Sequence, residues 1–268
     1  MSQAAAILAD QALLTALQQL MHQAGQAIMQ VYTQADFGIE QKQDSSPVTK
    51  ADLAAHHVLV DGLRLLTPEL AIVSEEDAAS LTVPSQHSCY WLIDPLDGTK
   101  EFIQRNGQFT VNLALIENHR PSLGFVSTPV DQSLYWGGKG LNAYRALDKQ
   151  TVAIKTRDDN TSPTLVVASK SHLNKDTTNF ISKLGDTELV QAGSSLKFLR
   201  IAEGKAHIYP RLAPTCEWDT AAAQAILEGA GGAVLQTNGK PMVYGKADIL
   251  NPYFIAYHHH PSQKKLSC

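Results

Sequence analysis

Apolar residues recur at helical spacing in the first quarter of the chain, which predicts two amphipathic helices. The first covers residues 11–35, which carry no acidic or basic side chain. Their glutamines and His22 nevertheless make the segment too polar for a membrane span. The second covers residues 48–67. Between the two helices, residues 37–40 favour a short strand and residues 44–47 favour a turn.

Short apolar segments follow and predict strands, most of which alternate as antiparallel neighbours do. They comprise residues 70–73, 89–93, 109–116, 123–127, 133–136 and 143–145. Residues 137–140, Gly-Gly-Lys-Gly, are too few for a nucleotide-binding fingerprint and predict a hairpin turn. This half of the chain therefore predicts an antiparallel meander.

Residues 146–163 are polar and charged, and they predict a boundary between two lobes, at about residues 1–147 and 148–268. Strands and helices alternate beyond it, which indicates an α/β lobe. The predicted strands cover residues 165–168, 187–191, 206–209 and 233–236, and the predicted helices cover residues 176–184, 195–203 and 219–228.

Composition narrows the class of protein without identifying it. The chain has 268 residues, 44% hydrophobic and 18% charged, as in ordinary soluble domains. A formal net charge of −4 does not favour nucleic acid as a partner. Three scattered cysteines, and no signal peptide, fit a reducing compartment, so we expect a cytoplasmic protein without a transmembrane segment.

Candidate chemistry centres on residues 91–102, with the sequence WLIDPLDGTKEF. An apolar strand ends in Asp94, Pro95 turns the chain, and Asp97, Gly98 and Thr99 open a predicted helix. Two carboxylates around a rigid turn, followed by small residues with accessible amides, could hold a cation beside a phosphate.

Further acids lie at the ends of predicted elements, where α/β proteins bind ions and phosphates. Glu75 follows a strand, Asp219 starts a helix, and Asp52 lies in a first helical turn. Each has an ordinary alternative: a solvated acidic loop for Glu75, an N-cap for Asp219 and a helix-dipole acid for Asp52. Taken together, oxygen ligands without clustered His or Cys favour Mg²⁺.

The motifs SPVTKAD (46–52), AIVSEED (71–77), WLIDPLDGTKEF and CEWDTAAAQAILEGAGG (216–232) occur in an order that resembles a known superfamily. It is the Mg²⁺-dependent, lithium-sensitive phosphomonoesterases, which include inositol monophosphatases and 3′(2′),5′-bisphosphate nucleotidases. Residues 100–102 (KEF), 193–198 (GSSLKF) and 250–256 (LNPYFIA) resemble the CysQ type of bacterial bisphosphate nucleotidase. The resemblance implies an α/β (α+β) fold, a layered αβαβα sandwich like that of inositol monophosphatase and fructose-1,6-bisphosphatase.

The resemblance also implies roles for individual residues. The first metal would be bound by Glu75, Asp94 and the Leu96 carbonyl, and the second by Asp94, Asp97 and Asp219. Asp52 resembles the acid that accompanies Thr99 and a weaker third metal. The backbone at Gly98 and Thr99 would bind the scissile phosphate, and Ser194 and Lys197 the other phosphate, with His172 and Arg211 as further candidates.

The implied reaction is hydrolysis of adenosine 3′,5′-bisphosphate, a by-product of sulfur assimilation, to AMP and phosphate with two to three Mg²⁺ ions. The hypothesis is in-line attack by water that Glu75 and Thr99 orient. Two alternatives stay open: hydrolysis of an inositol or sugar phosphate, or binding of a phospho-ligand without catalysis. The implied partner is a small phosphorylated nucleotide, the oligomeric state is open, and the resemblance allows peripheral association with the cytoplasmic side of the inner membrane.

Overall fold

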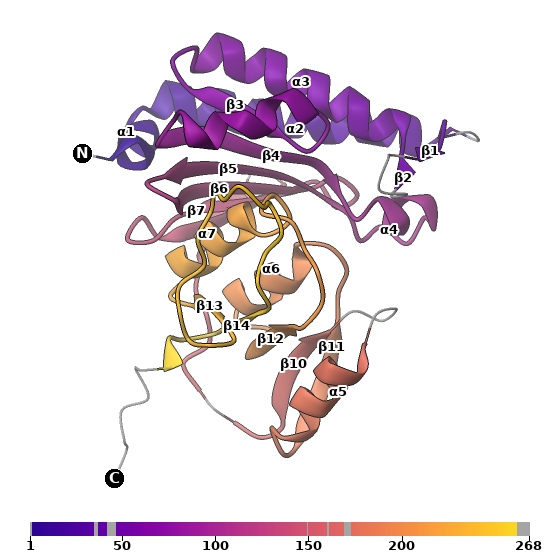
Figure 1. The fold of residues 1–268 in the computed structure, drawn as a ribbon, viewed down its shortest axis with the longest axis vertical. Helices are drawn as coiled ribbons and strands as arrows, with labels where there is room; N and C mark the ends of the chain where they lie inside the picture. Colours follow the sequence, from indigo (N-terminus) through magenta and orange to yellow (C-terminus); the bar gives the residue numbers. More distant parts are fainter. Residues whose placement is uncertain are drawn as a thin grey trace.

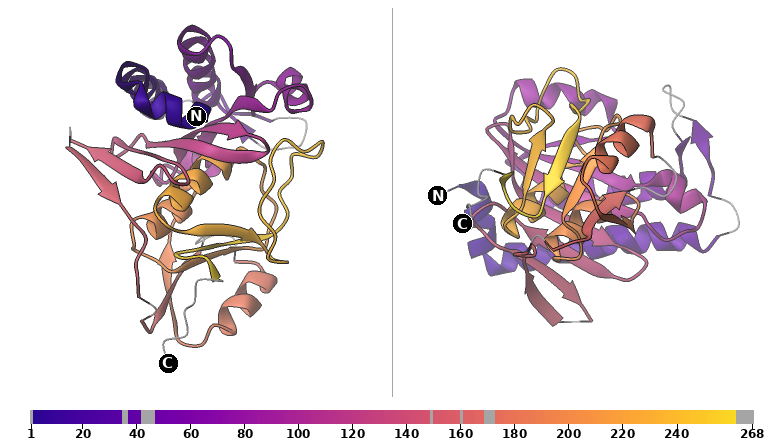
Figure 2. Two further views of the ribbon diagram at one scale, coloured as in Figure 1. Left: turned by 90° about the vertical axis from the view of Figure 1, so that its left-hand side faces the viewer. Right: turned by 90° about the horizontal axis from the view of Figure 1, so that it is seen from below.

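The computed structural model describes residues 2–34, 37–41, 47–148, 150–159, 161–168 and 173–261. Residues 44–46 of the predicted turn, and His172, lie outside the described residues. The described chain is layered, with helices above, between and below two sheets (Figures 1 and 2). This arrangement confirms the predicted αβαβα sandwich.

The first layer contains α1 (Gln3–Ala9), α2 (Gln11–Tyr32) and α3 (Lys50–Leu66), which cover one face of the larger sheet (Figure 1). Asp10 separates α1 from α2, because its side chain accepts hydrogen bonds from the first amides of α2. Leu17, Ile28 and Leu59 pack with sheet residues in one buried cluster. The predicted amphipathic helices are thus confirmed, with the first ending at Tyr32.

The larger sheet has seven strands in chain order, β3 to β9. They are β3 (Ala71–Ser74), β4 (Cys89–Asp97), β5 (Thr110–Glu117), β6 (Arg120–Thr128), β7 (Ser133–Gly137), β8 (Ala143–Leu147) and β9 (Gln150–Ile154). Only β3 and β4 pair in parallel; the others form the predicted antiparallel meander. Strand β9 is mostly exposed at the sheet edge and lies within the polar segment predicted as a boundary. The sheet therefore extends to Ile154.

Two short elements lie beside this sheet. A 3₁₀ helix, η1 (Ala78–Ser85), lies between β3 and β4. Strands β1 (Glu40–Gln41) and β2 (Pro47–Val48) form a two-stranded ribbon next to α3.

The second sheet has the order β11-β10-β12-β14-β13, with β14 antiparallel to both of its neighbours. The strands are β10 (Thr164–Ala168), β11 (Thr187–Gln191), β12 (Ile208–Arg211), β13 (Ala233–Gln236) and β14 (Phe254–Tyr257). Helix α5 (Lys175–Ser182) covers its outer face (Figure 1). Strand β14 was not among the predicted strands.

Helices α6 (Leu196–Ala202) and α7 (Ala221–Gly229) fill the space between the two sheets (Figure 1). The first turns of α7 are rich in alanine, which lets the helix approach the first sheet closely. At Gly124 on β6 a methyl group would lie 2.1 Å from the Ala222 carbonyl oxygen. This close contact fixes α7, and the residues just before it, against the first sheet.

Candidate active site

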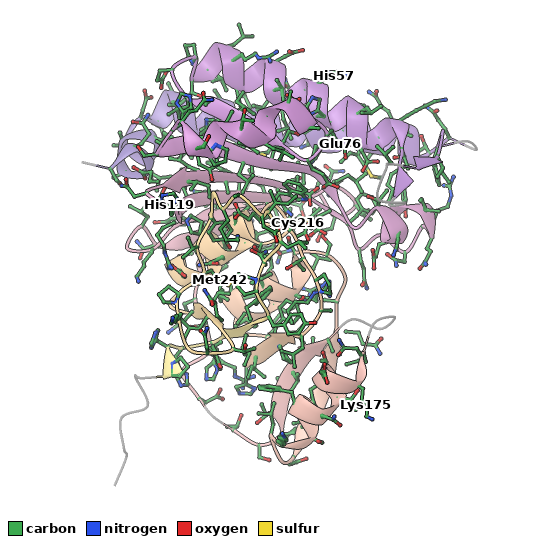
Figure 3. The ribbon with its side chains drawn as sticks, viewed as in Figure 1. His57, Glu76, His119, Lys175, Cys216 and Met242 are labelled. Carbon is green, nitrogen blue, oxygen red and sulfur yellow. The ribbon has the colours of Figure 1, made fainter. Side chains whose placement is uncertain are left out.

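Three carboxylates from distant parts of the chain meet where β3 and β4 end and α7 begins. Ligand oxygens of Glu75, Asp94 and Asp219 all lie within 4.8 Å of one another. Glu75 is placed by its amide, which donates to the Ile93 carbonyl at 3.2 Å and so extends the β3–β4 pairing. Figure 3 labels one neighbour of each of two ligands: Cys216, three residues before Asp219, and Glu76, next to Glu75. Cys216 lies where the lower layers meet the first sheet, and Glu76 lies above Cys216 in this view.

The electrostatics of these three carboxylates favour a bound cation. Burial, and then the charges of Glu75 and Asp97, raise the pKa of Asp94 well above its usual range. Burial, with Asp97 and Glu75 nearby, likewise raises the pKa of Asp219 to about 8. A divalent cation relieves such repulsion, and an oxygen-only ligand set suits a hard ion such as Mg²⁺. The residues present therefore fit a metal site.

Asp97 lies outside this group of three, and its carboxylate is held by side chains from other elements. Its Oδ2 accepts hydrogen bonds from Ser194 Oγ at 2.6 Å, Ser195 Oγ at 2.9 Å and Asn112 Nδ2 at 3.4 Å. The register of β4 against β5 shifts between Asp94 and Asp97, so the strand is irregular at this point. The predicted Asp97–metal contact stays a prediction.

Asp52 and Thr99 lie together, as expected from the resemblance. Thr99 Oγ1 donates to Asp52 Oδ1 at 3.2 Å and lies 3.4 Å from the Leu96 carbonyl oxygen. The other Asp52 oxygen accepts from the amide and hydroxyl of Thr49, which forms a capping box at the start of α3. The ordinary reading of Asp52 as a helix-start acid is therefore also correct.

Gly98 makes the turn between β4 and the short helix α4 (Thr99–Ile103). Its φ of 93° lies in the left-handed region that favours glycine. The Phe102 amide donates to the Gly98 carbonyl at 2.9 Å, so the predicted helix begins where the motif suggested, although it has only five residues.

A cavity of about 400 Å³ joins the acidic residues to a cationic region. Glu75, Asp97 and Asp219 line it together with Lys197 and Arg211. Lys197 is buried, and burial lowers its pKa to about 8 against the opposing effect of Asp97. Arg211 is held by an Nη2 hydrogen bond to the Pro214 carbonyl. Ser194 and the Gly98–Thr99 turn also line the cavity, so all the predicted phosphate contacts except His172, which lies outside the described residues, line it together.

Sequence reasoning missed Thr110, Asn112 and Ser195, which surround Asp97. Thr110 and Asn112 are fully buried polar residues two positions apart on β5, so they share one face of the strand. Their occurrence in an otherwise apolar run was a signal that could have found them, because buried polar side chains need partners.

The fold and the carboxylates define an α/β protein with an acidic cluster that fits a cation, next to the turn at Gly98. Residues 9–266 match the model of the inositol monophosphatase family, and the chain belongs to that family. It is 48% identical to the 3′(2′),5′-bisphosphate nucleotidase CysQ of Salmonella typhimurium, over 88% of this chain and 96% of that protein. The protein of the same name in Escherichia coli K12 is 46% identical, with the same coverage.

Solved structures of related proteins have the same fold. CysQ from Bacteroides thetaiotaomicron, described as a bacterial member of the inositol monophosphatase family, superposes with a TM-score of 0.79 at 38% identity. That match covers 91% of this chain and 96% of the other. An IMPase of Thermotoga maritima shares the fold, with a TM-score of 0.74 at 24% identity over 91% of each chain. Among the described residues, no helix is both long enough and apolar enough to cross a membrane.

Proposed function

We propose that this chain is a Mg²⁺-dependent 3′(2′),5′-bisphosphate nucleotidase that converts adenosine 3′,5′-bisphosphate to AMP and phosphate. The observation that carries the proposal is a cavity lined both by the half-buried carboxylates of Glu75, Asp97 and Asp219 and by the cations Lys197 and Arg211. Such a cavity suits a substrate with two phosphates, one at the metal site and one against the cations. The names of the relatives at 46–48% identity support the same substrate.

The metal assignment follows the resemblance and the geometry. Glu75, Asp94 and the Leu96 carbonyl would hold one Mg²⁺, and Asp94, Asp97 and Asp219 a second, with Asp52 near a weaker third. The clustering of Glu75, Asp94 and Asp219 supports the first two assignments. When bound, Mg²⁺ supplies charge neutralisation and a more acidic attacking water.

The side chains position the reactants. Asp52 Oδ1 accepts a hydrogen bond from the Thr99 hydroxyl. The Thr99 oxygen would therefore accept a hydrogen bond from the attacking water, which Glu75 would also orient. The backbone of Gly98 and Thr99 would bind the scissile phosphate. Ser194 and Lys197 would bind the other phosphate, with Arg211 as a further contact. Because phosphoryl transfer needs little covalent help, positioning and charge should supply most of the acceleration.

The division into lobes and the location in the cell extend the proposal. The metal and phosphate lobe was predicted at about residues 1–147 and the substrate lobe at about residues 148–268, within one phosphatase domain; because β9 pairs with β8, we propose that the first lobe reaches Ile154. A cytoplasmic location, lithium sensitivity and a role in sulfur metabolism stay predictions. No feature of the described residues supports peripheral association with the inner membrane.

A substrate panel tests the function. Phosphate release from adenosine 3′,5′-bisphosphate and from inositol 1-phosphate should each require Mg²⁺ and stop with a chelator. We expect the bisphosphate to be preferred in kcat/KM by about 10- to 100-fold, since one charged hydrogen bond to the second phosphate contributes roughly 1.5–3 kcal/mol. A preference for inositol 1-phosphate would overturn the substrate, and absence of turnover on both would overturn the enzyme.

A substitution of Lys197 tests whether this side chain binds the second phosphate. Lys197→Met should remove most of the preference for the bisphosphate over adenosine 3′-monophosphate, because the monophosphate lacks the group that Lys197 would bind. Lys183→Met, an exposed lysine at the end of α5, is the matched control and should leave the preference unchanged.

A further inference from the structure

Ser195 occupies the first turn of α6 in an unusual way. It is the N-cap residue, a position where serine ordinarily accepts a hydrogen bond from a helix amide, yet its side chain makes no capping bond. Its hydroxyl instead lies 2.9 Å from Asp97 Oδ2 and 3.1 Å from the carbonyl oxygen of Asp219. Ser195 is 1% exposed, so these contacts are made away from solvent.

Asn112 completes this arrangement from the first sheet. It is 1% exposed on β5, where an unpaired amide would be costly. Its Nδ2 donates to Ser195 Oγ at 2.9 Å and to Asp97 Oδ2 at 3.4 Å, and its Oδ1 lies 3.2 Å from Thr110 Oγ1, which also lies 2.6 Å from Ser194 Oγ. Every polar group of the side chain is thus directed by this network.

The proton positions follow from these partners. Asn112 Nδ2 can only donate, so Ser195 Oγ accepts from it and keeps one proton to give. The two acceptors for that proton are the Asp97 carboxylate and the Asp219 carbonyl, which belong to residues that line the same cavity. Ser195 therefore contacts both aspartates, while Asn112 fixes Ser195.

We propose that Asn112 and Ser195 are a positioning pair that sets the distance between Asp97 and Asp219 for the cation. The pair joins β5 of the first sheet to the start of α6, and so fixes the position of Asp97 relative to Asp219. It directs Asp97 Oδ2 toward protein donors, and Oδ1 is the oxygen we assign to the metal. The inference rests on the metal site of the proposed function.

Magnesium affinity tests the pair without reference to turnover. We would measure the Mg²⁺ concentration that gives half of the metal-induced rise in Tm, for the full chain without substrate. Ser195→Ala and Asn112→Ala should each raise that concentration by about 10- to 100-fold, the usual effect of losing a group that orients a metal ligand. Ser182→Ala, which removes an exposed hydroxyl bond on α5, should leave it unchanged.

Mg²⁺ affinity in two combined variants separates positioning from a general loss of structure. In the double variant the two effects should be less than additive, because both act on Asp97 through one network. In Asp97→Asn, Ser195→Ala should cost much less than in the wild-type chain. Wild-type Mg²⁺ affinity in both single variants, with normal binding by the wild type, would overturn this inference alone. Absence of Mg²⁺ binding by the wild type would overturn the metal site as well.

Discussion

Asp94 and Asp219 are acids whose ionisation opposes folding when no cation lies between them. The folded-state pKa of Asp219, about 8, exceeds its ordinary value of 3.8. The metal-free folded protein therefore holds a proton that the unfolded chain has released between about pH 4 and 8. By linkage, the contribution of this group to the free energy of unfolding is lost as the pH rises through that window.

Magnesium should reverse this loss, which gives a prediction with a definite sign. The cation must displace the proton, so its apparent affinity rises with pH up to about 8. We expect the increase in Tm caused by a fixed Mg²⁺ concentration over a chelator control to grow from pH 6 to pH 8. Melting curves at pH 6, 7 and 8 measure it. A rise in Tm that is constant or that shrinks with pH would contradict the buried carboxylate cluster.

At the scale of elements, one carboxylate serves both a helix and the site. Asp52 Oδ2 caps α3 through Thr49, and Asp52 Oδ1 accepts from Thr99 at the start of α4. The two threonines therefore contact the same side chain with different consequences. Thr49 supports the helix, whereas Thr99 is the residue that we propose takes part in the reaction.

Alanine substitution should separate these two roles. Thr49→Ala removes the N-cap and should lower the free energy of unfolding by about 1 kcal/mol, with less than a tenfold effect on kcat. Thr99→Ala should leave stability nearly unchanged and lower kcat by about 100-fold or more. Denaturant unfolding and steady-state rates on both variants measure this. Equal effects of the two substitutions on kcat would contradict the assignment.

Local patterns could predict most elements, for physical reasons that also explain the misses. The amphipathic period of α2 and α3 is visible in the sequence because each helix buries one face. Strands β5 and β6 are visible as short apolar runs because they are buried on both faces. Strand β9 is mostly exposed, so its polar residues resemble a linker. Strand β4 continues through Pro95 to Asp97, where the sequence predicted a turn. The strand accommodates the proline because its register against β5 shifts between Asp94 and Asp97.

At the scale of the molecule, the site depends on how closely α7 lies against the first sheet. Asp219 precedes α7, whereas Glu75 and Asp94 belong to that sheet. Displacement of the helix would separate these ligands. Gly124 allows the contact, since any side chain there would meet the backbone of Ala222.

Gly124→Ala should therefore affect stability and metal binding together. We expect a loss of about 1–3 kcal/mol in the free energy of unfolding from overpacking, and a weaker Mg²⁺ affinity. Gly25→Ala is the matched control: it lies within α2 with its nearest new contact at 3.4 Å, and should be neutral or slightly stabilising. An unchanged Mg²⁺ affinity in a destabilised Gly124→Ala protein would show that the position of α7 does not govern the site.

The acids of the site could be predicted from motifs, whereas their supporting network could not. Asp94 and Asp97 lie three residues apart at the irregular end of β4, so local sequence places them. Asn112 and Ser195 are 83 residues apart and meet only through the stacking of two sheets. Their partnership arises from tertiary packing, which no local pattern encodes.

Phosphorus NMR of adenosine 3′,5′-bisphosphate during turnover tests the central claim most directly, because it shows which phosphate leaves. With Mg²⁺, we expect the 3′-phosphate signal to be replaced by inorganic phosphate while the 5′-phosphate signal persists, as in AMP. Asp97→Asn, folded by its melting curve, should slow this conversion by about 10³-fold, the scale of several kcal/mol of lost charge stabilisation. Loss of the 5′ signal, turnover without Mg²⁺, or a near-normal rate in Asp97→Asn would contradict the account.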